Sequence, residues 1–245
     1  MSIISRLIQT WASLVESEEK PESRKDIVCL YDGTWHDVAG NRIEISKEEE
    51  RKIVRTISEI ESANYEAVPS LIMMDDVRTI SDVADYLECD REDMFLFFKY
   101  PTNDIREWKS PSSEDPTLSG GLYFLASANS YAGVDWVEVA DISGSIDNAS
   151  TFGKLLSVVL RWLKSRKIKL VASNCREATS NRFFTGGVFL RRFENEGYSR
   201  LGNVNRTEET DGEIFHLNIL VDMAWWGSLS ESERKEIVSM IERNL

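Results

Sequence analysis

Three carboxylates lie within one short stretch that is typical of a β-strand, at Asp135, Glu138 and Asp141. This stretch, residues 134–142, is rich in β-branched and aromatic residues and is followed by a turn signal. Because successive side chains of a strand point to opposite faces, Glu138 is expected to project opposite to Asp135 and Asp141. A carboxylate can act as a general base near neutral pH only where desolvation raises its pKa. Asp135 and Glu138 are therefore candidates for proton transfer. The alternative is that these acids lie on a solvated face and have no catalytic role.

The turn after this strand has the composition of a phosphate-binding helix entrance. A helix follows it, in which apolar residues recur at three- and four-residue spacing up to Leu163. The first backbone N–H groups of a helix have no partner within the helix, and they attract anions. The candidate phosphate ligands are the small residues at the entrance: Asn148, Ala149, Ser150 and Thr151. A capped helix entrance without a ligand is the alternative.

These two features open a predicted β-α-β-α-β unit. After the helix, residues 169–172 are predicted as a second strand, which Asn174 and Cys175 end. Residues 178–185 are predicted as a short helix, and paired glycines separate it from a third strand at residues 188–193.

The order and spacing of this unit resemble the core of the GNAT superfamily, the acyl-CoA N-acyltransferases. In that family a strand is followed by V-x-P-x-x-[R/Q]-G-x-G-x-[G/A]-x-x-L-L, and residues 142–156 match its length without an insertion. Ile142 stands at the Val position, and Asp147 stands where the family has Arg or Gln. The glycine positions hold other residues: Asn148, Ser150 and Phe152. The resemblance covers roughly residues 122–223.

The resemblance implies an α/β fold, an α+β mixed sheet with flanking helices, and a site for acetyl-CoA or another acyl-CoA between the two central strands. It places Ile142, Asn148, Ala149, Ser150, Thr151 and Asn174 at the cofactor. It also implies that Asp135 or Glu138 assists deprotonation of an amine. The family's tyrosine, which often serves as general acid, falls on Phe183. Tyr198 or Cys175 could replace it.

Two functions follow from this resemblance. The first is a divergent N-acyltransferase that moves an acyl group from acyl-CoA to an amine. The alternative is a catalytically inactive, acidic GNAT-like protein that works as a binding or inhibitor module or imitates nucleic acid. The intact spacing of the family motif favours the acyltransferase. The residues Asp147, Phe152 and Phe183, which differ from the family at matched positions, favour the inactive binding protein.

The amino-acid composition limits the classes of partner that the protein is expected to bind. The formal net charge of −13 disfavours binding to nucleic acid backbones or anionic membranes, and is compatible with a cationic substrate or a basic protein partner. The 3 cysteines are widely spaced, which is typical of a reducing compartment, and no apolar run is long enough for a membrane helix, so we expect a soluble, cytoplasmic protein. His36 and His216 have no companion at metal-ligand spacing, and no metal is expected.

We expect three parts in one continuous globular body. Residues 1–101 form an N-terminal portion with an amphipathic helix at 1–15 and a small β-meander, and residues 102–121 form a long loop. Residues 122–245 form the GNAT-like core.

Overall fold

The computed structural model describes residues 27–64, 74, 76–100, 122–131, 133–144, 149–177, 187–201, 207–210 and 212–244. The strands are β1 (Ile27–Tyr31), β2 (Thr34–His36), β3 (Met94–Lys99), β4 (Leu122–Tyr131), β5 (Val134–Gly144), β6 (Leu170–Arg176), β7 (Tyr198–Arg200), β8 (Thr207–Thr210) and β9 (Glu213–Asp222). The helices are α2 (Lys47–Asn64), α3 (Ile80–Tyr86), α4 (Ala149–Ser165), α6 (Gly187–Asn195), α7 (Met223–Ser228) and α8 (Glu231–Asn244).

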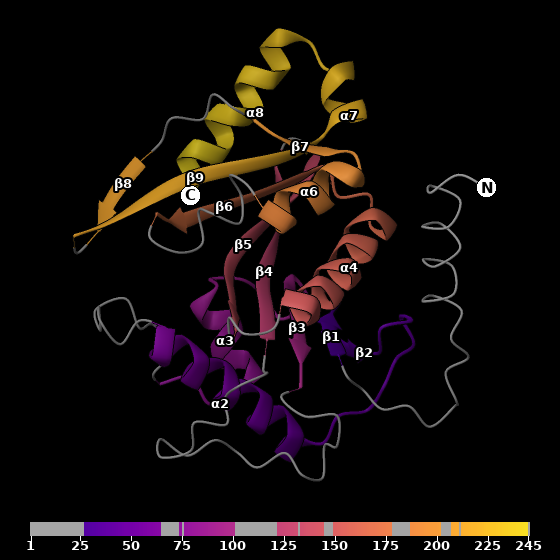
Figure 1. Cartoon of the computed structure of the whole chain (residues 1–245), viewed down its shortest axis with the longest axis vertical. Coiled ribbons are helices and arrows are strands. Elements are labelled where there is room, and N and C mark those ends of the chain that lie inside the picture. The colour runs from indigo at the N-terminus through magenta and orange to yellow at the C-terminus, as the bar shows by residue number, and fades with distance from the viewer. Residues whose placement is uncertain are drawn as a thin grey trace.

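The strands form a single sheet in the order β2-β1-β3-β4-β5-β6-β9-β7, with β8 paired to β9 (Figure 1). Among these pairs, β5 and β6 run parallel and the others run antiparallel. A parallel pair needs a crossover connection, and α4 provides it. The predicted mixed α/β sheet with flanking helices is therefore confirmed.

One face of the sheet is covered by α4 and α6. The apolar stripe of α4 packs with β3, β4 and β5 in a core that includes Phe97, Phe124, Val139, Leu156 and Leu163. The aromatic ring of Trp162 lies 4.2 Å from that of Phe95 between ring centroids, so the C-terminal half of α4 is fixed against β3.

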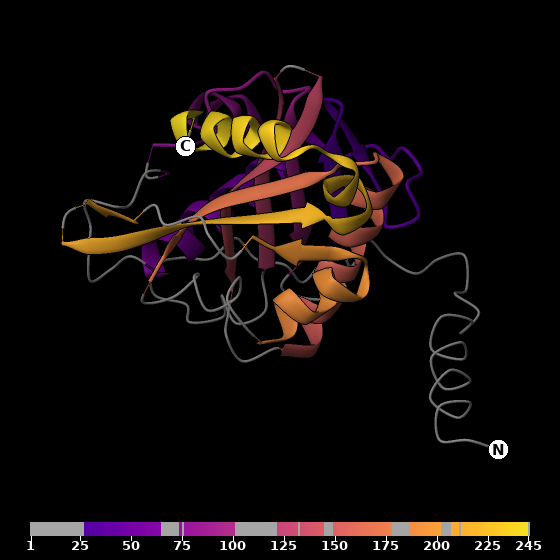
Figure 2. The ribbon, with the colours of Figure 1, turned by 90° about the horizontal axis from the view of Figure 1, so that it is seen from above.

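The opposite face carries two further cores. One lies under α2 and α3 and includes Leu30, Ile57, Val83, Leu96 and Leu125. The other lies under α8 and includes Trp136, Ala172, Ile219, Met240 and Ile241. Figure 2 shows α8 and α6 on opposite sides of the sheet near β9.

Several predicted elements differ from the structure. The predicted strand at residues 188–193 is wrong, because this segment is the helix α6. Phe189 and Phe193, four residues apart, stack at 4.8 Å and are both buried, which is a helical spacing hidden within an apolar run. In the predicted meander, β1 and β2 form the hairpin, whereas Arg42 contributes only an isolated bridge to His36.

The predicted helices at residues 1–15 and 178–185 and the loop at 102–121 lie outside the described residues. In the part of the chain that the structure describes, no helix is long and apolar enough to cross a membrane.

Candidate active site

The parallel strands β5 and β6 pair over three positions only. The paired residues are Trp136 with Leu170, Val137 with Val171, and Glu138 with Ala172. Beyond these positions both strands continue, but β5 stays paired with β4 as far as Gly144, and β6 stays paired with β9 as far as Arg176. The two strands therefore part after Glu138 and Ala172. We call this point the fork, and the diverging strand ends its two arms.

A β-bulge lies at the start of the β5 arm. Ala126 of β4 faces Val139, whereas the preceding residue Leu125 faces Asp141, so Ala140 is an extra residue without a partner in register. A bulge bends its strand and increases the local twist. Its position directly beyond Glu138 gives a physical reason for the parting of β5 from β6.

Ser173 closes the bottom of the fork. Its hydroxyl donates a hydrogen bond of 2.8 Å to the carbonyl oxygen of Val139, and its side chain is only 4% exposed. A side chain of β6 therefore satisfies a carbonyl of β5 at the first position where the backbone ladder is interrupted. This contact keeps the two arms together at their base.

Glu138 is a half-buried carboxylate at the fork itself. Its cross-strand partner is Ser127, which alternates with Leu125 and Tyr123 on β4, so Glu138 faces the side of the sheet that α2 and α3 cover. Burial, followed by the like charge of Glu88 after α3, raises the pKa of Glu138 to about 7. No hydrogen bond or ion pair from another described residue reaches this carboxylate. Glu138 thus has the properties of a base that works near neutral pH.

The other two acids of β5 have different environments. Asp135 is exposed and lies before the paired segment. Asp141 accepts a hydrogen bond from the buried phenol of Tyr123. The prediction that Asp141 faces away from Glu138 is wrong, because the bulge at Ala140 shifts the alternation by one residue.

The open end of the fork leads to the start of α4. The β5 arm carries Ile142, whose side chain packs against the core under α4, and the β6 arm carries the half-buried Asn174. Ala149, Ser150 and Thr151 form the first turn of α4, which contains no acidic residue, whereas Asn148 lies outside the described residues.

A guanidinium group lies beside the second turn of α4. Arg192 of α6 donates a hydrogen bond of 2.8 Å to the hydroxyl of Ser157, which itself donates to the carbonyl of Gly153. A Cβ atom at Gly153 would lie 2.9 Å from the Nη2 atom of Arg192. The missing side chain at position 153 therefore lets the guanidinium approach the helix.

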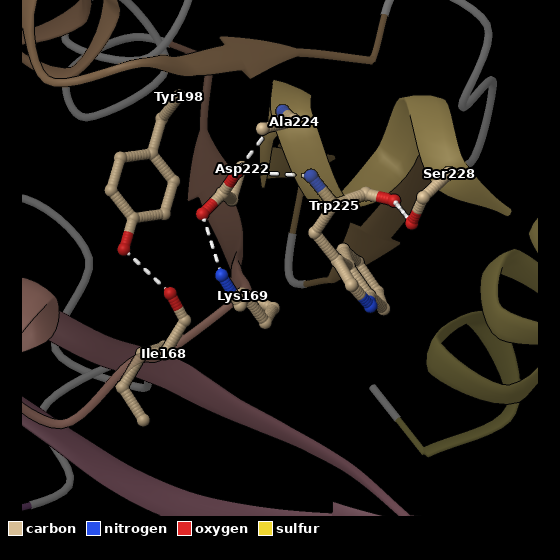
Figure 3. A network of polar contacts seen from close by, with 7 residues as sticks. All are labelled: Ile168, Lys169, Tyr198, Asp222, Ala224, Trp225 and Ser228. Carbon is tan, nitrogen blue, oxygen red and sulfur yellow. Dashed lines mark hydrogen bonds and ion pairs between the residues drawn. The ribbon is translucent and has the colours of Figure 1, made fainter.

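Tyr198 lies beside Ile168, which precedes the start of β6 (Figure 3), whereas the fork is further along this strand. Its phenol donates a 2.6 Å hydrogen bond to the carbonyl of Ile168, and its side chain is buried. Burial, with the charges of Asp222 and Glu196, raises the pKa of this phenol. The structure does not bring Tyr198 together with Glu138.

Cys175 lies on the β6 arm and is buried, with its Sγ atom 3.4 Å from the Oγ atom of Ser173. His36 and His216 occupy different strands, β2 and β9. No group of three or more His, Cys, Asp or Glu residues within the described ranges could hold a metal ion.

Sequence patterns missed three contributors to this site. Ser173 is a polar residue inside an otherwise apolar strand, and that was the available signal for it. Ser127 and Glu88 approach Glu138 only through strand register and the packing of α3, which leave no local pattern.

No protein-family model matches the sequence, and no curated protein matches it. Among solved structures, an acyl-CoA N-acyltransferase from Pseudomonas aeruginosa is similar at 11% identity and a TM-score of 0.41, with 80% of this chain and 99% of that chain covered. PaiA N-acetyltransferase from Thermoplasma acidophilum, in complex with coenzyme A, is similar at 12% identity and a TM-score of 0.39, with 72% of this chain and 95% of that chain covered. The NatC complex bound to Gag peptide and CoA contains a chain that is similar at 10% identity and a TM-score of 0.43, with 80% of this chain and 98% of that chain covered.

At identities of 10–12% and TM-scores of 0.39–0.43, these likenesses show nothing about the activity of this chain. The fold itself is defined by the strand order and by the parallel pair β5 and β6.

Proposed function

We propose that this chain is an N-acyltransferase that moves an acyl group from acetyl-CoA or another acyl-CoA to an amine. The observation that carries the proposal is the fork, where two parallel neighbours part beside a half-buried carboxylate, Glu138, to which no other described residue is bonded. A parallel pair that opens in mid-sheet leaves backbone groups of both arms without their usual partners, and an extended ligand can use them.

The residues around the fork fit an acyl-CoA. From Val139 to Gly144 the β5 arm spans about 17 Å at roughly 3.3 Å per residue, which suits an extended arm running from the start of α4 to the fork. The diphosphate would be held at the N-terminal turn of α4 by Asn148, Ala149, Ser150 and Thr151, where helix amides favour anions. Ile142 and Asn174 would flank the extended arm. When bound, the acyl-CoA supplies an acyl group activated as a thioester.

Glu138 would act as the general base. The attacking amine, in its neutral form, bonds through nitrogen to the acyl carbon and then gives up one proton, which a carboxylate with a pKa of about 7 is matched to accept at neutral pH. The C–S bond of the thioester breaks in the same reaction, and coenzyme A leaves as a thiolate that takes up a proton from solvent. Asp135 is exposed and Asp141 is bonded to Tyr123, so neither offers a comparable environment.

The acceptor would be a cationic amine. Glu88 and Glu138 place two negative charges on the same side of the sheet, and the chain carries a net charge of −13. Such a surface attracts positively charged substrates and raises their encounter rate.

Calorimetric titration with acetyl-CoA and with free coenzyme A tests the proposal. We expect binding in the micromolar range for both ligands. Ser150→Glu should abolish it, because a carboxylate in the first turn of α4 repels a diphosphate while leaving the helix stable. The matched control is Ser81→Glu, which puts the same charge into the first turn of α3 and should leave the affinity unchanged.

Absence of heat with both ligands would remove the acyltransferase proposal. The alternative, an acidic binding or inhibitor protein, would then account for the fold. Undiminished affinity in Ser150→Glu would instead show that the diphosphate is bound elsewhere.

A further inference from the structure

Ser173 occupies the position toward which an acyl group would point. A ligand whose diphosphate lies at α4 enters the fork from its open end, so its far end meets the base of the two arms. There the hydroxyl of Ser173 bridges to the carbonyl of Val139 at 2.8 Å.

The space behind this bridge is filled. Val137, Val139 and Val171 are buried in the core under α4. Two residues further along the β6 arm and on the same face of the sheet, the Sγ atom of Cys175 lies 3.4 Å from the Ser173 hydroxyl. Close-packed interiors have few voids that would admit another methylene group, and breaking the hydroxyl bond would leave a buried carbonyl unsatisfied.

We propose that Ser173 is a specificity-determining residue that limits the donor to short acyl groups. This inference rests on the proposed function. The bridge between Ser173 and Val139 forms the floor of the acyl site, and an acyl chain longer than acetyl must break this bridge or displace the valines behind it.

The experiment is a set of calorimetric titrations of the full chain with free coenzyme A, acetyl-CoA, butyryl-CoA and hexanoyl-CoA. For the wild type we expect hexanoyl-CoA to bind at least about tenfold more weakly than acetyl-CoA, since an extra methylene that does not fit changes selectivity by about 10-fold or more. Ser173→Gly should reduce the ratio of the two affinities, that for acetyl-CoA over that for hexanoyl-CoA, to about threefold or less. Ser173→Thr, which keeps the hydroxyl, should retain the wild-type ratio.

Free coenzyme A should bind equally well to the wild type and to every Ser173 variant, because it has no acyl group to meet the floor. Ser58→Ala is the matched control: its hydroxyl also donates a buried 2.8 Å hydrogen bond to a backbone carbonyl, that of Met74, but it lies on α2. It should keep the wild-type ratio.

Three results would overturn the inference. They are equal affinity of the wild type for acetyl-CoA and hexanoyl-CoA, an unchanged ratio in Ser173→Gly, and the same change of ratio in Ser58→Ala. If Ser173→Gly does not fold, Ser173→Ala takes its place, and the wild-type series remains decisive. Failure of free coenzyme A to bind the wild type would instead refute the proposed function.

Discussion

The phenol of Tyr123 donates a hydrogen bond to the carboxylate of Asp141, whereas Glu138 on the same face of β5 accepts none from a described residue. The two carboxylates therefore have different chemistry, although they lie only three positions apart on β5. Asp141 is held in place by a buried partner, and Glu138 is available to a substrate.

This difference predicts the effects of two isosteric changes. Glu138→Gln should lower kcat/KM for acyl transfer by about 100- to 10,000-fold, the usual contribution of a general base. It should also remove the part of the rise of kcat/KM that occurs at about pH 7, where the wild-type carboxyl loses its proton, and leave only the rise due to ionisation of the amine itself. The measurement is release of the coenzyme A thiol with a panel of amines between pH 5.5 and 9.

Two controls accompany this prediction. Asp141→Asn should keep the rise with pH, and Asp135→Asn should behave as the wild type because Asp135 is exposed. An unchanged pH profile in Glu138→Gln would contradict the role assigned to Glu138.

Folding stability should depend on the charge of Glu138. Its pKa in the folded protein lies above its ordinary value, so ionisation destabilises the fold. The cost is absent below about pH 4, grows as the pH rises to about 7, and stays constant above that. Glu138→Gln should therefore be more stable than the wild type by on the order of 2 kcal/mol at pH 8.5, with no difference at pH 4. Urea unfolding at both pH values measures this, and equal stability at pH 8.5 would refute it.

Tyr198 is expected to stabilise the fold without taking part in proton transfer. Tyr198→Phe leaves the buried carbonyl of Ile168 without its 2.6 Å hydrogen bond, which should cost about 1–2 kcal/mol of unfolding free energy. The pH dependence of kcat should not change. Loss of an alkaline limb in that profile would show that Tyr198 does act as the general acid.

The guanidinium of Arg192 should strengthen binding of the anionic donor. Arg192→Gln is expected to weaken coenzyme A binding by about three- to tenfold and to reduce its dependence on salt, because the group lies beside the second turn of α4. Titrations at low and high salt measure the effect. The neighbouring, exposed Arg191 provides the control variant Arg191→Gln, and equal losses in both variants would indicate a general charge effect.

The sequence predicted the strand of β5, the helix α4 and the strand of β6 because their apolar periodicities are local properties. Alternation also predicted correctly that Glu138 and Asp135 point to opposite faces. It failed for Asp141, since a bulge at Ala140 is a property of the pairing between β4 and β5 and leaves no pattern in β5 alone.

The fork is likewise a property of pairing. Residues on both arms have strand-forming composition, and only the register of β5 with β4 and of β6 with β9 determines where the parallel pair ends. The helix α6 was missed for a related reason: its run of Val188, Phe189 and Leu190 is also typical of a strand, and packing of Phe189 and Phe193 decides for a helix.

Hydrogen–deuterium exchange with and without coenzyme A tests the central claim, that the diverging arms of β5 and β6 receive the donor. Exchange should slow in residues 139–144 and 173–176 on adding the ligand, while β1 and β3, which lie on the far side of β4, remain unchanged. Coenzyme A binding that leaves exchange in both arms unaltered, or that protects only other strands, would contradict the account.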